Sequence, residues 1–203
     1  MFGKMLVFPQ ATNSAHVRLT TSRQNLGAVT VCMRYLTDLT RAFSFFSLAT
    51  PSYQNDFLLF KNPARDEISL SVRNADIIFK GQDFQSNRWQ SICGTRDAAS
   101  GLVQLWVDGK PSAMKLGTYS NITGPMIIVL GQEQDSHGGA FDINQSFVGM
   151  ITDVHMWDYI LCPHHIDNYN QKFNFPTGNV LNWNSVEFQI TGRVLIQKDQ
   201  NQC

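Results

Sequence analysis

Side-chain oxygens are concentrated in one stretch of the chain, residues 130–145 (LGQEQDSHGGAFDINQ). Gly138 and Gly139 lie within it and allow a sharp turn, so that several oxygens can converge on one point. Hard cations such as Ca²⁺ take about 6–8 oxygen ligands from carboxylates, amides and carbonyls. The composition predicts a calcium site without EF-hand spacing, although a polar surface loop shares much of it. The residues that carry these oxygens are Glu133, Gln134, Asp135, Asp142, Asn144 and Gln145.

A second kind of chemistry is carried by Glu133 and Asp135 alone. Residues i and i+2 of a strand share a face, and jelly-roll glycoside hydrolases use paired carboxylates. The segment after Asp135 is a glycine-rich loop, however, and the oxygens of Asp142 and Gln145 suit a metal better. We therefore expect no enzyme, with a jelly-roll hydrolase as the less favoured alternative. A third possibility is a calcium-dependent glycan-binding lectin or laminin-G-like adhesion module, in which only the ligand would differ.

Short β-branched and aromatic segments separated by turn residues dominate the chain, as an antiparallel sandwich requires. An Asp108-Gly109 turn indicates a hairpin, and Pro163 suits the first position of a short helix, Pro163–Gln171. The pattern predicts an all-β, two-sheet antiparallel jelly-roll sandwich, lectin-like, with one short α-helix. The expected strands are 17–21, 28–36, 42–49, 57–60, 68–72, 77–79, 88–94, 102–107, 126–131, 147–157, 186–190 and 192–196.

The composition of the 203-residue chain excludes several classes of partner. With 16 basic and 16 acidic residues the net charge is zero, which gives no reason to expect nucleic-acid binding. No apolar run approaches the roughly 20 residues that span a membrane. Without repeats or linkers, residues 1–203 are expected to form a single domain. The N-terminus lacks the apolar stretch of a signal peptide, so the leader of a secreted protein would have been removed or lie outside this sequence.

Four cysteines allow three disulfide pairings. Cys32 and Cys93 lie in strand-like segments, Cys162 lies at the expected helix start, and Cys203 ends the chain. Four free thiols in a cytosolic protein remain the alternative.

The glycosylation triplets and the histidines give weaker evidence of a functional site. Glycosylation triplets begin at Asn121 and Asn144, and Asn121 is the better acceptor because a glycan at Asn144 would crowd Gln145. The histidines form no zinc pattern: His137 is interpreted as a spacer, His155 as a core or interface residue, and the pair at 164–165 as solvated.

The run LGQEQDSHGG, followed by Asp142 and Gln145, resembles the calcium loop of short pentraxins. Further matching stretches follow in the family's order: 7–9 (VFP), 105–111 (LWVDGKP), 149–157 (GMITDVHMW) and 180–183 (VLNW). The family's motif His-x-Cys-x-Ser/Thr-Trp-x-Ser/Thr is kept at Cys93 and Thr95 but departs at 91, 96 and 98. On residues 8–194 the chain is identified as a divergent member of the short pentraxin family, which implies a disulfide between Cys32 and Cys93.

The resemblance also implies two neighbouring calcium ions that share carboxylates. Asn55, Glu133, the Gln134 carbonyl and Asp135 would hold the first ion. Glu133 and Asp135 would also serve the second ion, together with Asp142 and Gln145. Gln54 stands where the family has Asp, so the first site should be weaker unless Asp56 compensates through a shift of the loop.

The family's ligands are phosphocholine and phosphoethanolamine on microbial surfaces and damaged membranes. Phosphate would meet the excess positive charge of two calcium ions against three carboxylates. By resemblance, Phe60 would receive the choline methyl groups, Asp76 would face the cation, and Ser71 would lie between them. Asp76 is one methylene shorter than the family's usual Glu.

The implied protein is a secreted pattern-recognition molecule of innate immunity. It would assemble as a cyclic homo-oligomer, a pentamer in most of the family, and gain avidity from many sites on one face. Complement components are a further expected partner, with Asp108 as the candidate contact. We expect Cys162 and Cys203 to pair with each other.

Overall fold

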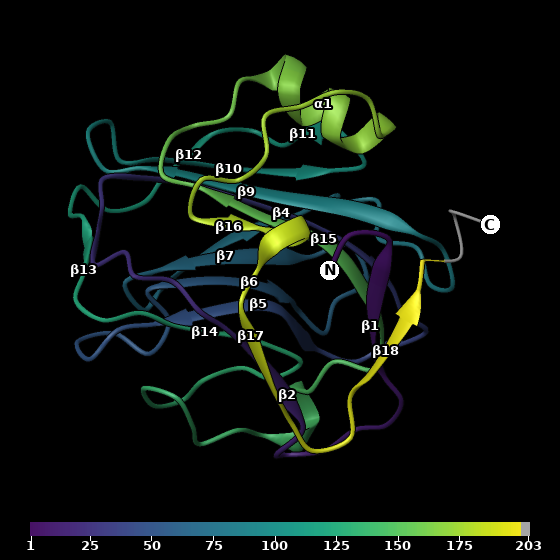
Figure 1. The fold of residues 1–203 in the computed structure, drawn as a ribbon. Helices are drawn as coiled ribbons and strands as arrows, with labels where there is room; N and C mark the ends of the chain where they lie inside the picture. The colour runs from purple at the N-terminus through teal and green to yellow at the C-terminus, as the bar shows by residue number, and fades with distance from the viewer. Residues whose placement is uncertain (200–203) are drawn as a thin grey trace.

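A computed structural model describes residues 1–199, whose regular structure consists mainly of antiparallel strands in two large sheets (Figure 1). The larger sheet contains β1 (Lys4–Phe8), β4 (Ala28–Leu36), β9 (Gln90–Asp97), β10 (Leu102–Val107), β11 (Lys110–Pro111), β12 (Lys115–Leu116), β15 (Gly149–Trp157), β16 (Leu181–Asn182) and β18 (Leu195–Lys198). Its main strand order is β11-β10-β9-β4-β15-β1-β18, with β12 beside β10 and β16 beside β15.

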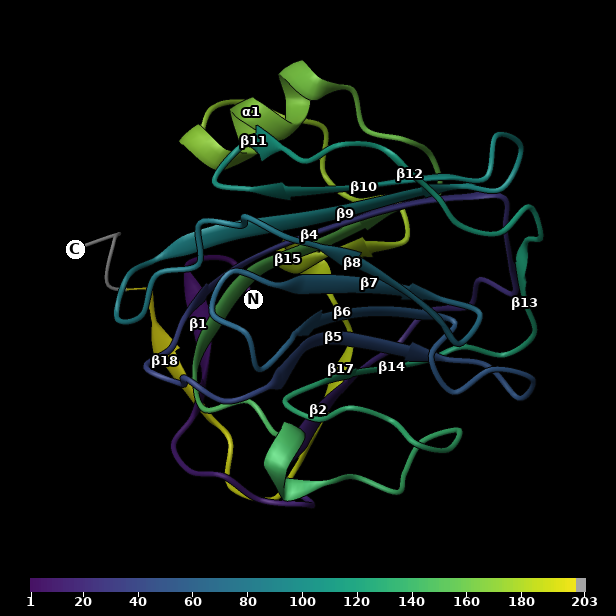
Figure 2. The same cartoon turned by 180° about the vertical axis from the view of Figure 1, so that it is seen from behind.

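The smaller sheet faces it across the core, and its order is β17-β2-β14-β5-β6-β7-β8. Its strands are β2 (His16–Leu19), β5 (Phe43–Ala49), β6 (Phe57–Lys61), β7 (Ile68–Val72), β8 (Ala75–Phe79), β14 (Ile127–Leu130) and β17 (Phe188–Thr191). A separate pair joins β3 (Asn25–Leu26) to β13 (Ile122–Thr123), and two 3₁₀ turns are η1 (Ile143–Gln145) and η2 (Trp183–Ser185). Strands distant in sequence are thus neighbours in space, as Figure 2 shows from behind, and this topology confirms the predicted jelly-roll sandwich.

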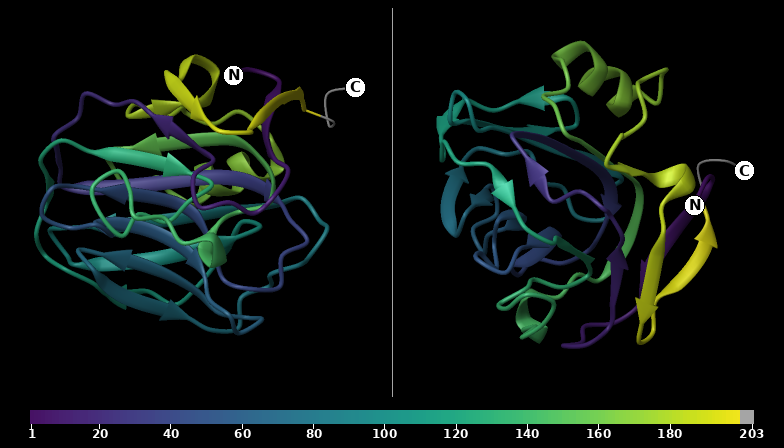
Figure 3. Two further views of the ribbon diagram at one scale, coloured as in Figure 1. Left: turned by 90° about the horizontal axis from the view of Figure 1, so that it is seen from below. Right: turned by 60° about the vertical axis from the view of Figure 1, so that its left-hand side comes forward.

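The core forms where the inward faces of the two sheets meet (Figure 3). Alternation along β4 shows the reason: Val31 and Met33 belong to this core, whereas Cys32 between them belongs to a second cluster on the outer face. In β5 every residue is buried, because the outer face of this strand is covered as well. The covering segment is residues 131–145, which is anchored to Ser47 of β5.

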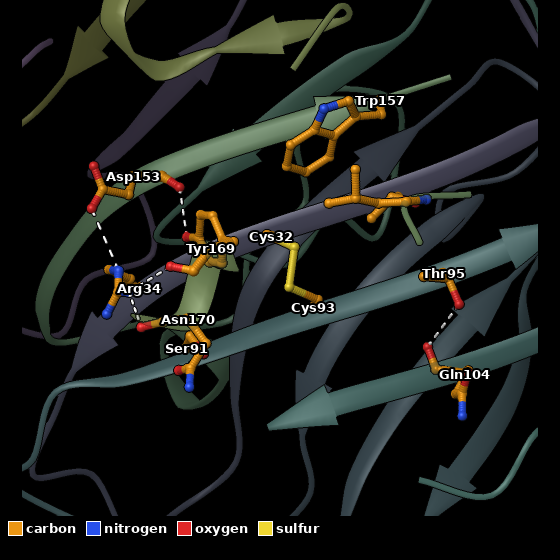
Figure 4. The surroundings of a disulfide bond; sticks show 12 residues. Cys32, Arg34, Ser91, Cys93, Thr95, Gln104, Asp153, Trp157, Tyr169 and Asn170 are labelled. Atoms are coloured by element: carbon orange, nitrogen blue, oxygen red, sulfur yellow. Dashed lines mark hydrogen bonds and ion pairs between the residues drawn. A yellow bond between two sulfur atoms is a disulfide. The ribbon is translucent and has the colours of Figure 1, made fainter. Parts of the chain in front are cut away.

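The helix α1 (Pro163–Gln171) packs on the outer face of the larger sheet and has the predicted bounds. Its Ile166 and Tyr169 contact the second cluster, which includes the disulfide between Cys32 and Cys93. These cysteines are directly opposed in the pairing of β4 with β9, so the bridge implied by the family resemblance is present (Figure 4).

Arg34 of β4 fixes the end of α1 (Figure 4). Its guanidinium donates to the carbonyl oxygens of Tyr169 and Asn170 and pairs with Asp153 at 3.5 Å. A cation beside the last carbonyls of a helix stabilises it through the helix dipole.

One predicted strand is misplaced and one strand was missed. Gly192 adopts a positive φ of 72° in the turn between β17 and β18, so the predicted strand 192–196 begins only at Leu195. Strand β1 was not predicted, because its KMLVF sequence has no polar–apolar alternation. Its consecutive residues Met5 and Leu6 are both buried, so both faces of the strand are covered, which explains that pattern.

Within residues 1–199, no helix has both the length and the apolar character needed to cross a membrane.

Candidate metal and ligand site

A cavity of about 150 Å³ opens on the outer face of the smaller sheet. Its floor is built by alternate residues of adjacent strands, which share a face. In the strand register, Leu58 lies opposite Ser71, Phe60 lies opposite Ser69, and Ser71 also lies opposite Asp76. The residues that line the cavity are Asn55, Leu58, Phe60, Ser69, Ser71, Asp76, Glu133, Asp135 and Gln145.

Three buried oxygens in this cavity lack hydrogen-bond donors among the described residues. They are Oδ1 of Asn55, Oε2 of Glu133 and Oε1 of Gln145. Buried acceptors without partners are rare in folded proteins because the lost hydration is not replaced. All three are oxygens, with the carboxylate of Asp135 beside them, and this is the donor set that a hard cation prefers. The side chains present therefore fit a calcium ion.

Glu133 is the most perturbed of these groups. The residue is only 3% exposed, and its pKa is raised from 4.5 to about 7, chiefly by burial. The negative charges of Asp135, Asp76 and Asp142 contribute to this rise, and Asp135 contributes the most of the three. A hydrogen bond from the Asn55 side chain opposes these effects. The arrangement thus disfavours an ionised Glu133 unless positive charge is supplied.

The loop that carries Glu133 is held by its buried neighbour Gln134. The Gln134 side-chain amide donates to the carbonyl oxygens of Ser47 and Ile127, and its Oε1 accepts from the Gly138 amide. Gly138 has a φ of 92°, which favours glycine at the turn. Because the side chain is occupied in this way, only the main-chain carbonyl of Gln134 is available as a ligand.

The far end of the loop is held by Arg41. Its guanidinium donates to the carbonyl oxygens of Asn144 (3.1 Å) and Ser146 (2.8 Å). Gln145 lies between these two anchors and enters the cavity wall. One end of the oxygen-bearing segment is therefore fixed to β5, and the other end to the loop that precedes β5.

Asp142 and Gln54 do not line the cavity. Oδ1 of Asp142 accepts hydrogen bonds from the main-chain and side-chain nitrogens of Asn144 and so caps η1. Among residues 1–199, no group of three or more His, Cys, Asp or Glu side chains is arranged to hold a metal. The side chains brought together are consequently two carboxylates and two amides of the expected set, while a ligand role for Asp142 stays a prediction.

Asp56 does not line the cavity. Its side chain is buried and accepts a hydrogen bond from Thr50 at 2.7 Å. Asn55 reaches the cavity from the turn that precedes β6, whereas the buried Asp56 carboxyl interacts with the positive charges of Arg73 and Arg96.

The ligand-binding residues expected on the sheet lie together. Ser71 donates a hydrogen bond to Oδ1 of Asp76 across the β7–β8 pair, and Phe60 lies in the same wall. Leu58 and Ser69 complete this wall and were not singled out from the sequence. The period-two pattern of β6 and β7 could have identified them, because each is two residues from a residue that was.

Other polar residues lie elsewhere. Asp108, in a turn at φ 48°, accepts from the Ser91 amide and the Gln90 side chain. His155 is buried, which lowers its pKa to about 4, and its Nδ1 accepts from the Gly178 amide.

Of the two remaining cysteines, the structure describes Cys162. Cys162 is an exposed free thiol with its sulfur 3.3 Å from Nδ1 of His165. Cys203 lies outside the described residues, so its expected pairing with Cys162 stays a prediction.

Comparisons with known proteins agree over nearly the whole chain. Residues 4–198 match the model of the Pentaxin family. The chain is 40% identical to C-reactive protein of Sus scrofa over 205 residues, covering 97% of this chain and 88% of the relative. It is 38% identical to Jeltraxin of Lepidobatrachus laevis over 199 residues, with the same coverage.

A solved structure shows the same fold. The heptameric SAP-like pentraxin from Limulus polyphemus superposes with a TM-score of 0.89 at 22% identity, covering 98% of this chain and 96% of that one. The family match and the sequence identities establish what the cavity residues suggested, namely that this chain belongs to the pentraxin family.

Proposed function

We propose that the protein recognises phosphocholine- or phosphoethanolamine-type head groups in a calcium-dependent manner. The observation that carries the proposal is the two-part wall of the cavity on the smaller sheet. One part presents unpartnered oxygens of Asn55, Glu133 and Gln145, and the other presents Phe60 with Asp76.

The oxygen-bearing part would hold calcium through Asn55, Glu133, Asp135, Gln145 and the carbonyl of Gln134. Bound calcium would supply positive charge and open coordination positions for a phosphate oxygen. Asp142 and Gln54 are outer members of the proposed ligand set, because neither lines the cavity.

The second part of the wall suits a cationic, methylated end. Phe60 is partly exposed and offers a ring face to methyl groups. One oxygen of Asp76 is directed by Ser71, which leaves the other free to face a cation. Because the side chain of Asp76 is short, we expect its contact with the cation to contribute only modestly to the binding affinity.

The test is retention on a phosphocholine resin with calcium or with excess chelator. Retention should require calcium and should fall at least about 10-fold for Asp135→Asn, since a ligand carboxylate is lost. Asp38→Asn is the matched control, because Asp38 is exposed and is not part of the cavity wall. Equal retention with and without chelator would refute the proposal.

A paired test addresses the apolar part of the wall. Phe60→Ala should weaken phosphocholine binding but leave inorganic phosphate binding unchanged, because phosphate has no methyl groups. Phe173→Ala removes an equally large ring that is 62% exposed and outside the cavity, and should change neither.

The proposal extends to the oligomeric state and the biological role of the protein. We infer a secreted, non-enzymatic innate-immunity protein that forms a cyclic homo-oligomer, with complement as a candidate partner. The family membership supports a ring, and the heptameric relative shows that ring size varies from the usual five. Native mass spectrometry with calcium would measure the subunit number, and a monomer at all concentrations would contradict the ring.

A raised pKa at Glu133 beside Asp135 would also suit a general acid. The cavity of about 150 Å³ is small for a sugar chain, however, which supports binding of a head group over hydrolysis. Persistent polysaccharide cleavage in chelator would favour the hydrolase instead.

A further inference from the structure

A second cavity, of about 340 Å³, opens at one end of the sandwich, where three loops meet. These loops connect β4 to β5, β6 to β7 and β8 to β9, and they lie together at the left of Figure 2. The cavity shares no residue with the calcium cavity, so a ligand bound here is independent of the proposed function. Its lining residues are Thr40, Lys61, Pro63, Arg65, Phe84 and Ser86.

Lys61 is the unusual member of this lining, because its side chain is charged yet the residue is only 2% exposed. It follows Phe60 in β6 and therefore points to the opposite face of the strand. Its ammonium donates to the carbonyl oxygens of Asn62 (2.7 Å) and Ala64 (2.6 Å) and lies 5.1 Å from the centre of the Phe84 ring. These contacts use two of the three N–H donors and leave the positive charge without a bound anion.

The acidic residues nearest in sequence are directed elsewhere. Glu67 pairs with Lys80 at 3.4 Å, and Asp66 accepts a hydrogen bond from the Gly81 amide at 3.1 Å. Within residues 1–199, neither Lys61 nor Arg65 forms an ion pair with a carboxylate. The cavity therefore combines two cations that have no direct counter-charge. Lys61 is removed from water, and this burial lowers its pKa, although the negative charges of Asp66 and Glu67 act in the opposite direction.

The rest of the wall combines apolar surface with hydroxyl groups. Phe84 and Pro63 provide the apolar surface, and Phe84 is continuous with the main core. The hydroxyls of Thr40 and Ser86 form no hydrogen bond to any described residue and can donate to a ligand. A volume of about 340 Å³ is near the lower limit for small-molecule sites, so the ligand must be compact.

Charge and shape together specify the ligand class. We propose that this cavity binds a small amphipathic carboxylate, with its head group between Lys61 and Arg65 and its apolar body against Phe84. Arginine suits a carboxylate because its planar guanidinium can donate two parallel hydrogen bonds. The buried ammonium of Lys61 gives the site its preference for an anion over a neutral molecule of the same shape.

The probe is octanoate, titrated into the full chain and followed by protein-observed NMR in excess chelator. Chelator is essential, because otherwise the carboxylate could bind calcium in the first cavity. We expect saturable shifts at the amides of Thr40, Arg65 and Ser86. The neutral 1-octanol should bind at least about 5-fold more weakly, because it cannot supply the counter-charge.

Two variants test the site without disturbing the buried lysine. Arg65→Gln should weaken octanoate about 2–5-fold, the effect of losing one exposed charge pair. Arg193→Gln, an exposed arginine in the turn between β17 and β18, is the matched control and should leave the affinity unchanged. Ser86→Trp should abolish binding by filling the cavity mouth from an exposed position.

Three outcomes would overturn the proposal: no saturation by about 10 mM octanoate, a weak limit for ligands of this size; equal binding of 1-octanol; or equal affinity of Arg65→Gln and Arg193→Gln. None of them affects the calcium proposal, because the measurement is made without calcium.

Discussion

Replacement of Glu133 by Gln should stabilise the calcium-free protein and remove the stabilisation that calcium gives. In the ion-free fold Glu133 has a pKa of about 7 against 4.5 for an ordinary glutamate. A carboxyl group whose pKa is raised by folding holds more protons in the folded state, so its contribution to stability falls as pH rises from 4.5 to 7. At pH 8 the full cost is present.

The size of that cost follows from the shift of the pKa. The difference between 4.5 and about 7 corresponds to about 3.5 kcal/mol at roughly 1.4 kcal/mol for each step of one in the pKa. Gln has nearly the same shape, keeps an oxygen to accept from Asn55, and carries no charge. We expect Glu133→Gln to raise the free energy of unfolding at pH 8 by about 1–3 kcal/mol, and to change it little at pH 4.5.

The assay is thermal and urea unfolding in chelator and in calcium. At a calcium concentration about 100 times the dissociation constant, the wild-type protein should gain about 3 kcal/mol and the variant much less. The order of stability should therefore reverse between the two conditions. Glu187→Gln is the matched control, because Glu187 is exposed and outside the calcium cavity. A variant that is less stable than wild type in chelator at pH 8, or that gains as much from calcium, would refute this reasoning.

Three further predictions concern stability. Replacing Cys32 and Cys93 by Ala should lower the free energy of unfolding by about 4 kcal/mol, since the bridge closes a loop with a sequence separation of 61 residues; an unchanged urea midpoint would contradict it. In the Glu133→Gln background, the free energy of unfolding should fall by roughly 3 kcal/mol as pH drops from 6.5 to 4. The reason is that His155 takes up a proton in the unfolded chain but stays neutral in the folded protein, where its pKa is about 4. Adding His155→Asn should flatten that pH profile. Gly131→Ala should lower the free energy of unfolding by at least about 2 kcal/mol in the same assay, because φ is 93° and the new Cβ would lie 2.3 Å from a ring atom of Phe8 in β1. Gly81→Ala is the control for the backbone strain alone, because Gly81 has a φ of 71° and no neighbour within 4 Å.

Local patterns in the sequence predicted most of the fold. The helix over Pro163–Gln171 was predicted with its observed bounds, because Pro163 marks the first helical turn and no other segment of the sequence suggested a helix. Strand β4 was likewise found at its observed bounds, 28–36. Strand β1 was not, because both of its faces are buried and its sequence has no alternation to detect.

The oxygen-rich loop was visible in the sequence, but its partners on the sheet came from the family resemblance. Residue types and spacing identified Glu133, Asp135 and Gln145 as candidate ligands, and the structure brings them into one cavity with Asn55. The same reasoning included Asp142, which the structure places as the cap of η1. Composition reports which oxygens are close along the chain, whereas the direction of each side chain depends on the local turn.

Tertiary structure alone decided the chemical state of these groups. The pKa of Glu133 is raised because the loop is folded down onto β5 by Gln134, more than 80 residues from Ser47 in sequence. The second cavity likewise exists only because three loops separated in the sequence by whole strands meet at one end of the sandwich, next to the buried ammonium of Lys61. A sequence determines charge and local geometry, but burial is a property of long-range packing, and burial is what perturbs a pKa or leaves a charge without a partner.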